Sequence, residues 1–149
     1  MDQSRARTGA ALAAIGGVVL VLSLFLDWYQ LQLPSQGGQD RPGPTFDAWA
    51  GLGRTDVLLL AVGIAAVACA VLLYGGWVRR SNLVQAAVLL LGLGAVVLVL
   101  YRGLNAPTRV IFGVELETTL QIGWFVAVLA SGMIAVGGGA AIDRRSPQP

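Results

Sequence analysis

The stretch that decides the fold is Asp56–Tyr101, DVLLLAVGIAAVACAVLLYGGWVRRSNLVQAAVLLLGLGAVVLVLY. Two apolar runs, Val57–Tyr74 and Asn82–Leu100, contain no charged residue and flank a short basic turn at 75–81. Each run has about 18 to 20 residues, and a helix of that length crosses a hydrocarbon core of about 30 Å. The turn is so short that it must reverse the direction of the chain directly. The stretch therefore predicts two antiparallel transmembrane helices.

The turn also predicts which way these helices point. It contains Arg79 and Arg80 and no acidic residue, and short basic loops stay in the cytoplasm. The segments expected on that side of the membrane hold six arginines and two acidic residues. Those expected on the other side hold four arginines and six acidic residues. This asymmetry predicts a multi-pass protein of the cell membrane with both termini cytoplasmic.

The composition points to lipid as the solvent of the whole chain. Of 149 residues, 56% are hydrophobic and 12% are charged, whereas soluble proteins average about 25% charged. A chain this small cannot bury so much apolar surface in a water-soluble core. We therefore expect residues 1–149 to form a single integral membrane domain whose partner is the lipid bilayer. The net charge of +2 is too small to indicate a nucleic-acid partner.

Two further apolar runs complete the predicted fold, an all-α transmembrane four-helix bundle with up-down-up-down topology. The first run follows a basic N-terminus but offers no small-residue cleavage site, so we expect a retained helix rather than a secretory signal. Thr118–Gln121 has the spacing of a capping box, which places the start of the last helix near residue 119. The four helices are expected at approximately 8–27, 55–76, 82–101 and 119–141.

The two outer loops, 28–54 and 102–118, carry strand-like patterns. Apolar residues alternate with glutamines from Tyr29 to Leu33, and apolar residues recur at every second position from Val110 to Leu116. Residues 45–49 fit either a returning strand or a short interfacial turn. We expect a small extracytoplasmic β element in which strands of the two loops pair.

Small residues recur at every fourth position on the first and last predicted helices. In lipid, such stripes let backbones approach closely and supply much of the association between helices. Three interpretations stay open: a mere abundance of Ala and Gly, a contact between copies of the chain, and packing of the first helix on the fourth. The candidate packing residues are Gly9, Ala13, Gly17, Ala127, Ser131, Ala135 and Gly139.

Aromatic side chains gather near the predicted outer interface. Amphipathic rings anchor membrane proteins at this level, which is the simpler interpretation. The alternative is an apolar surface that binds a lipid or a partner protein, with Phe112 covering part of a cluster that includes Trp28 and Trp49. The candidate surface residues are Trp28, Tyr29, Phe46, Trp49 and Phe112.

The chain is poor in residues that perform chemistry. It has no histidine, and Cys69 is its one cysteine, so the usual metal, haem and thiol-pair sites are not expected. Asp27 and Asp56 are expected at helix ends, where water or headgroups can solvate them. We expect no cofactor, no metal and no catalytic residue.

The segments Phe25–Tyr29, Phe46–Trp49, Asp56–Leu60 and Gly123–Phe125 resemble small uncharacterised four-helix membrane proteins of actinobacterial type. The resemblance covers most of the chain and implies a four-helix membrane fold, but no activity. The general plan is also similar to that of claudins, which have four helices and a long first outer loop with tryptophan. The paired loop cysteines of claudins are missing here, so the likeness does not extend to barrier function.

These observations favour a non-enzymatic integral membrane protein. Its role would be accessory or structural, with the outer loops binding a membrane-protein partner or a second copy of the chain. The alternative is a small transporter or channel subunit. An enzyme is the third and least favoured class.

Overall fold

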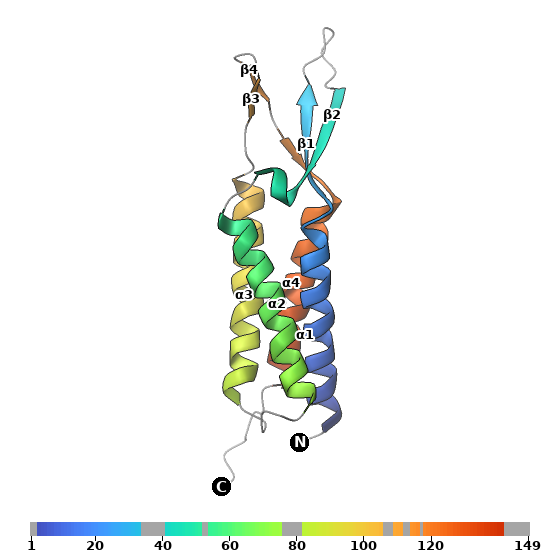
Figure 1. Ribbon diagram of the computed structural model, residues 1–149, viewed down its shortest axis with the longest axis vertical. Coiled ribbons are helices and arrows are strands. Elements are labelled where there is room, and N and C mark those ends of the chain that lie inside the picture. Colours follow the sequence, from blue (N-terminus) through green and yellow to red (C-terminus); the bar gives the residue numbers. More distant parts are fainter. Residues whose placement is uncertain are drawn as a thin grey trace.

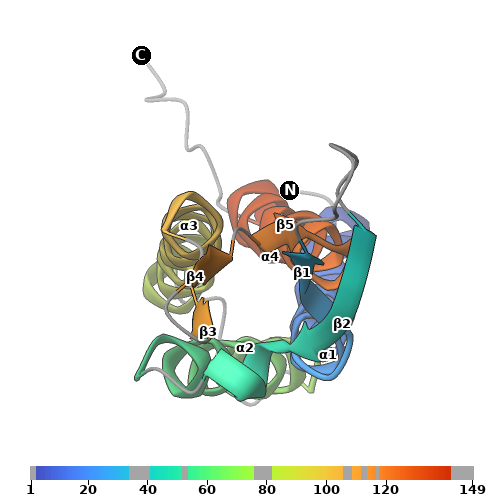
Figure 2. The ribbon, with the colours of Figure 1, turned by 90° about the horizontal axis from the view of Figure 1, so that it is seen from above.

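The computed structural model describes residues 3–33, 41–51, 54–75, 82–105, 109–111, 114–116 and 118–141. The fold is mostly helical, and its helices run alternately up and down (Figure 1). Viewed from above, the helices form a ring in chain order (Figure 2). The four helices are α1 (Gln3–Ser23), α2 (Arg54–Tyr74), α3 (Asn82–Leu104) and α4 (Ile122–Ala141).

Three of these helices are long and apolar enough to cross a membrane, namely Arg54–Tyr74, Leu83–Leu104 and Ile122–Ala140. The fourth, α1, contributes a shorter apolar segment at Arg7–Ser23. The outward faces of the helices carry large apolar side chains, and on α3 the exposed fraction reaches 86% at Leu104. A bundle that folds in water would place polar side chains on these faces.

The interior of the bundle combines large apolar side chains with many small residues. Ala66, Ala95 and Ala127 are completely buried. Glycines bring neighbouring backbones into direct contact, so that a Cβ atom added to Gly17 of α1 would lie 2.8 Å from the carbonyl oxygen of Gly63 on α2. Close backbone approach of this kind is how helices associate when lipid removes the hydrophobic drive between them.

A small antiparallel sheet lies beyond one end of the bundle (Figure 1). Its strand order is β2-β1-β5, with β1 at Asp27–Leu33, β2 at Arg41–Asp47 and β5 at Thr118–Leu120. A short 3-10 helix, η1 (Ala48–Gly51), leads from β2 toward α2. We call β1, β2, β5 and η1 the cap, and we call the end of the bundle beneath it the cap end.

The remaining described strands, β3 (Arg109–Ile111) and β4 (Val114–Leu116), pair with each other in a separate antiparallel hairpin. The predictions that both outer loops contain strands and that strands of the two loops pair are thus confirmed, but β3 and β4, from the segment expected to pair with the first loop, pair with each other. The strand of the second loop that joins the first loop is β5, through the pair Tyr29↔Leu120.

The same pairing corrects the expected helix boundaries. Helix α1 ends at Ser23, four residues earlier than expected, because Asp27 already belongs to β1. Thr118–Gln121 is not a capping box, because its first three residues form β5 and α4 begins at Ile122. The backbone N–H of Gln121 donates a hydrogen bond to the carbonyl oxygen of Trp28 at 2.9 Å. Pairing with β1 therefore determines where α4 begins.

Gly92 provides a test of the glycine contacts. A Cβ atom at Gly92 would collide with the backbone of Ala135 on α4, so Gly92→Ala should destabilise the fold by about 1–3 kcal/mol through overpacking. Gly94→Ala is the matched control on the same helix, because a Cβ atom there meets nothing within 4 Å. Thermal unfolding in one detergent measures both variants. Equal unfolding midpoints would contradict the packing described.

Candidate functional site

A buried ion pair lies at the cap end of the bundle. Nη2 of Arg102, near the end of α3, is 3.2 Å from Oδ2 of Asp56, in the first turn of α2. The exposed fraction of the side chain is 0% for Asp56 and 12% for Arg102. The expectation that solvent or headgroups surround Asp56 is therefore wrong.

The position of Asp56 on its helix explains this burial. The buried residues of α2 recur at spacings of three and four, and Asp56 is the first of them, followed by Leu59, Gly63, Ala66 and Ala70. The helix face that packs into the core therefore carries the carboxylate inward. A carboxylate without access to water needs a charged partner, and Arg102 provides it.

Tyr29 of β1 packs over the ion pair from the cap. Its ring centroid lies 5.9 Å from Cζ of Arg102, and its hydroxyl donates a hydrogen bond to the carbonyl oxygen of Arg102 at 3.4 Å. Tyr29 is 2% exposed, and this burial raises its pKa above 10.0. The charge of Asp56 raises this pKa further, whereas Arg102 opposes the shift. The hydroxyl therefore stays protonated at neutral pH and can donate.

Two tryptophans form hydrogen bonds at the cap end through their indole N–H groups, Trp28 from β1 of the cap to α1 and Trp124 from α4 to α3. Trp28 is completely buried, and its Nε1 donates to the carbonyl oxygen of Ser23 at 2.6 Å. Nε1 of Trp124 donates to the carbonyl oxygen of Val99 on α3 at 2.9 Å. Ser23 is the last residue of α1, where the following turn of the helix no longer supplies an N–H group to its carbonyl oxygen.

Glutamine side chains add polar links within the cap. Nε2 of Gln121 donates to Oε1 of Gln30 at 3.0 Å, and Nε2 of Gln30 donates to the carbonyl oxygen of Gly43 at 3.2 Å. Gln30 thus connects all three regions of the sheet, since it lies on β1, Gly43 lies on β2 and Gln121 follows β5. The cap and the bundle are joined by both polar and apolar contacts.

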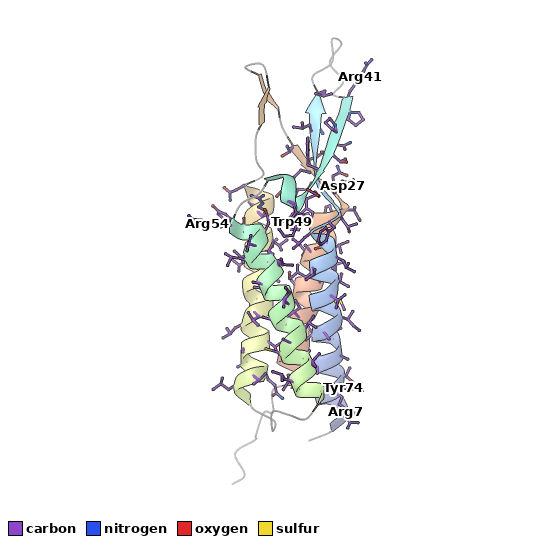
Figure 3. The ribbon with its side chains drawn as sticks, in the orientation of Figure 1. Arg7, Asp27, Arg41, Trp49, Arg54 and Tyr74 are labelled. Atoms are coloured by element: carbon purple, nitrogen blue, oxygen red, sulfur yellow. The ribbon has the colours of Figure 1, made fainter. Side chains whose placement is uncertain are left out.

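The structure places the predicted aromatic residues at different depths. Trp28 and Tyr29 belong to the interior and do not offer their rings to a partner. Phe46, paired with Tyr29 across the sheet, is half-buried. Trp49 is also half-buried, and its ring centroid lies 5.8 Å from that of the exposed Phe25 (Figure 3 labels Trp49). Phe112, and with it the proposed cover of this cluster, lies outside the described residues.

The predicted small-residue positions lie against several helices. A Cβ atom at Gly137 of α4 would meet Gly9 and Ala13 of α1. Gly17 lies against Gly63 of α2 rather than against α4. The other four residues are on α4. Ala127 is buried, and Oγ of Ser131 donates a hydrogen bond to its carbonyl oxygen at 2.7 Å. Ala135 lies against Gly92 of α3, and Gly139 is exposed.

Sequence reasoning missed Arg102 as a site residue. The signal was available, because the two predicted antiparallel helices place Asp56 and Arg102 at the same end with opposite charges. Within the described part of the chain, no group of three or more His, Cys, Asp or Glu side chains could hold a metal ion. What the cluster of Asp56, Arg102 and Tyr29 can do is couple the cap to two helices electrostatically.

Comparison with known proteins yields no match, whether with protein-family models, with curated proteins or with solved structures.

Tyr29 gives a prediction for alkaline pH. Because its pKa is raised in the fold, its stabilising contribution is complete below pH of about 10 and is lost as pH rises through the folded pKa. Thermal unfolding midpoints should therefore fall more steeply above pH of about 10 for the wild type than for Tyr29→Phe, which has no group to ionise. Tyr101→Phe is the matched control, because Tyr101 is 58% exposed. Identical pH profiles for the two variants would contradict the assignment.

Proposed function

We propose that the chain is a multi-pass protein of the cell membrane, with four helices crossing the bilayer and both termini in the cytoplasm. The distribution of side chains supports the insertion, because large apolar residues face outward over the lengths of the helices. The arginines of the turn at 75–81 and of the two termini support the orientation. In this arrangement the cap lies on the extracytoplasmic side.

We further infer a non-enzymatic role, in which the cap binds a membrane-protein partner or a second copy of the chain. The observation that carries this proposal is the attachment of the cap. Trp28 and Tyr29 attach β1 to the helix ends through a buried and a partly buried hydrogen bond, so the cap presents a surface of defined shape. A preorganised surface loses less entropy when it binds a partner.

The exposed strand of the cap is β2, at one edge of the sheet. Edge strands commonly bind other proteins by adding a strand, but Pro42 and Pro44 have no backbone N–H to donate. Recognition through β2 would therefore use side chains rather than a continued sheet. Among those exposed are Arg41 and Thr45 (Figure 3 labels Arg41).

The buried ion pair favours a second candidate function, a small transporter or channel subunit. Ionisable residues within membrane proteins often mark the path of an ion or a proton. Asp56 and Arg102 lie at the cap end rather than at mid-helix, and this position suits a structural link better than a complete path. The accessory role is therefore our leading proposal.

The orientation is tested with a reporter that is active only in the cytoplasm. Fused after Pro149 it should be active, and inserted at Gly38 it should be silent, because the arginine distribution places these positions on opposite sides. Reporter activity in whole cells, normalised to the amount of membrane-bound protein, gives the result. Activity at Gly38 with silence at Pro149 would reverse the orientation.

The binding role is tested by co-purification in mild detergent. Thr45→Arg places a bulky charge on exposed β2 and should remove a bound partner, or lower self-association, by about tenfold or more, as loss of a central contact does. Thr8→Arg is the matched control, because Thr8 is exposed near the opposite end of the bundle. Quantitative mass spectrometry of the purified complexes gives the ratio.

Two outcomes would reject the accessory role. One is equal recovery of every partner with Thr45→Arg and Thr8→Arg. The other is a proton flux in protein-containing liposomes that Asp56→Asn abolishes, which would support the transporter instead.

A further inference from the structure

The neighbouring helices of the ring are not held together in the same way. Three of the four pairs are joined by glycines at which the backbones touch. These are Gly16 and Gly137 for α1 with α4, Gly17 and Gly63 for α1 with α2, and Gly92 and Gly138 for α3 with α4. Contacts of this kind leave no room for a side chain at these positions.

The pair of α2 and α3 lacks such a contact. Of the glycines in these two helices, Gly63 faces α1, Gly92 and Gly103 face α4, and a Cβ atom at Gly94 would meet nothing within 4 Å. These helices also share the least contact of any neighbouring pair in the ring (Figure 2). We call the line along which they meet the α2–α3 seam.

The seam is joined at its two ends. At the end opposite the cap the chain itself connects Tyr74 to Asn82. At the cap end the link is the ion pair of Asp56 and Arg102. The covalent connection limits how far the helices can separate at one end, whereas the ion pair at the other end can dissociate, so the cap end is where the seam can open most widely.

The cap controls the surroundings of this ion pair. Tyr29 packs its ring on the guanidinium of Arg102 and its hydroxyl on the carbonyl oxygen of the same residue. Two opposite charges attract each other several times more strongly in a protein interior than in water. As long as Tyr29 covers the pair, water stays away and the attraction is strong. A displaced cap would let water in and weaken it.

We propose that the α2–α3 seam is a lateral opening of the bundle, latched at the cap end by Asp56 and Arg102 and released when the cap moves Tyr29. Displacement of the cap frees the end of α2 from that of α3, and the two helices separate there while the glycine contacts hold the rest of the ring. This goes beyond binding at the cap, because it links an event on the cap to the exposure of the bundle interior.

Spin-label distance measurements test the latch. In a background with Cys69→Ala, labels at Leu58→Cys and Tyr101→Cys report on the cap end of the seam, and labels at Leu72→Cys and Leu83→Cys report on its opposite end. All four positions are exposed, so the labels should not disturb the core. The wild-type protein should give one short distance for each pair.

Removing the charge of Asp56 should open the α2–α3 seam at its cap end only. With Asp56→Asn, the cap-end pair should gain a population at longer distance that the wild type lacks, while the opposite pair keeps its distance. A third label pair at the cap ends of α3 and α4, Leu100→Cys with Phe125→Cys, is the matched control and should also stay unchanged. Exchange of the charges, Asp56→Arg with Arg102→Asp, should restore the short distance.

The role of the cap is tested with Tyr29→Ala, which leaves both charges in place. It should produce the same longer population at the cap end of the seam. An unchanged distance with Tyr29→Ala would overturn the control by the cap. An unchanged cap-end distance with Asp56→Asn would overturn the latch itself. So would longer distances for all three label pairs, because these would indicate general loosening of the bundle.

Discussion

The burial of one carboxylate constrains much of this structure. Asp56 has no access to solvent, and an isolated charge in such surroundings would cost several kcal/mol. Arg102 must therefore lie beside it, which fixes how far α3 extends relative to α2. Tyr29 must cover both, which fixes where β1 crosses the helix ends. A pair of this kind contributes little net stability compared with apolar residues of the same size. Its stronger effect is on register, since a shift of either helix by one turn would leave a buried charge alone.

A second feature is the close contact of helix backbones, which in lipid replaces the missing hydrophobic drive between apolar helices. Glycines and alanines lie at these contacts, and large apolar residues face outward, as at Leu104, which is 86% exposed. The consequence is an uneven ring. Helices α1 and α4 meet at glycines and share the most contact in the ring. Helices α2 and α3 have no such glycine contact, and a polar contact at one end links them instead.

The sequence alone predicted the four helices and the presence of strands in both loops, because long uncharged runs and alternating residues are local signals. It failed where partners distant in the chain decide the outcome. Thr118–Gln121 looks like a helix start, yet β1, almost ninety residues earlier, recruits Thr118–Leu120 as a strand. Asp56 looked solvated because its burial depends on the packed face of α2. Trp28 looked like an interfacial anchor, but its indole N–H bonds to Ser23 inside the fold.

The pairing of β1 with β5 also has a consequence for how the protein is made. β1 and β2 are close in the chain and can pair early during synthesis, whereas β5 immediately precedes α4. The sheet cannot be completed until β5 has been made, and α1 cannot gain its most extensive helix contact until α4 follows. Until α4 has been made, the face of α1 that packs on α4 therefore stays uncovered. The slow step of folding should be this final closure, because contacts between distant parts of a chain form late.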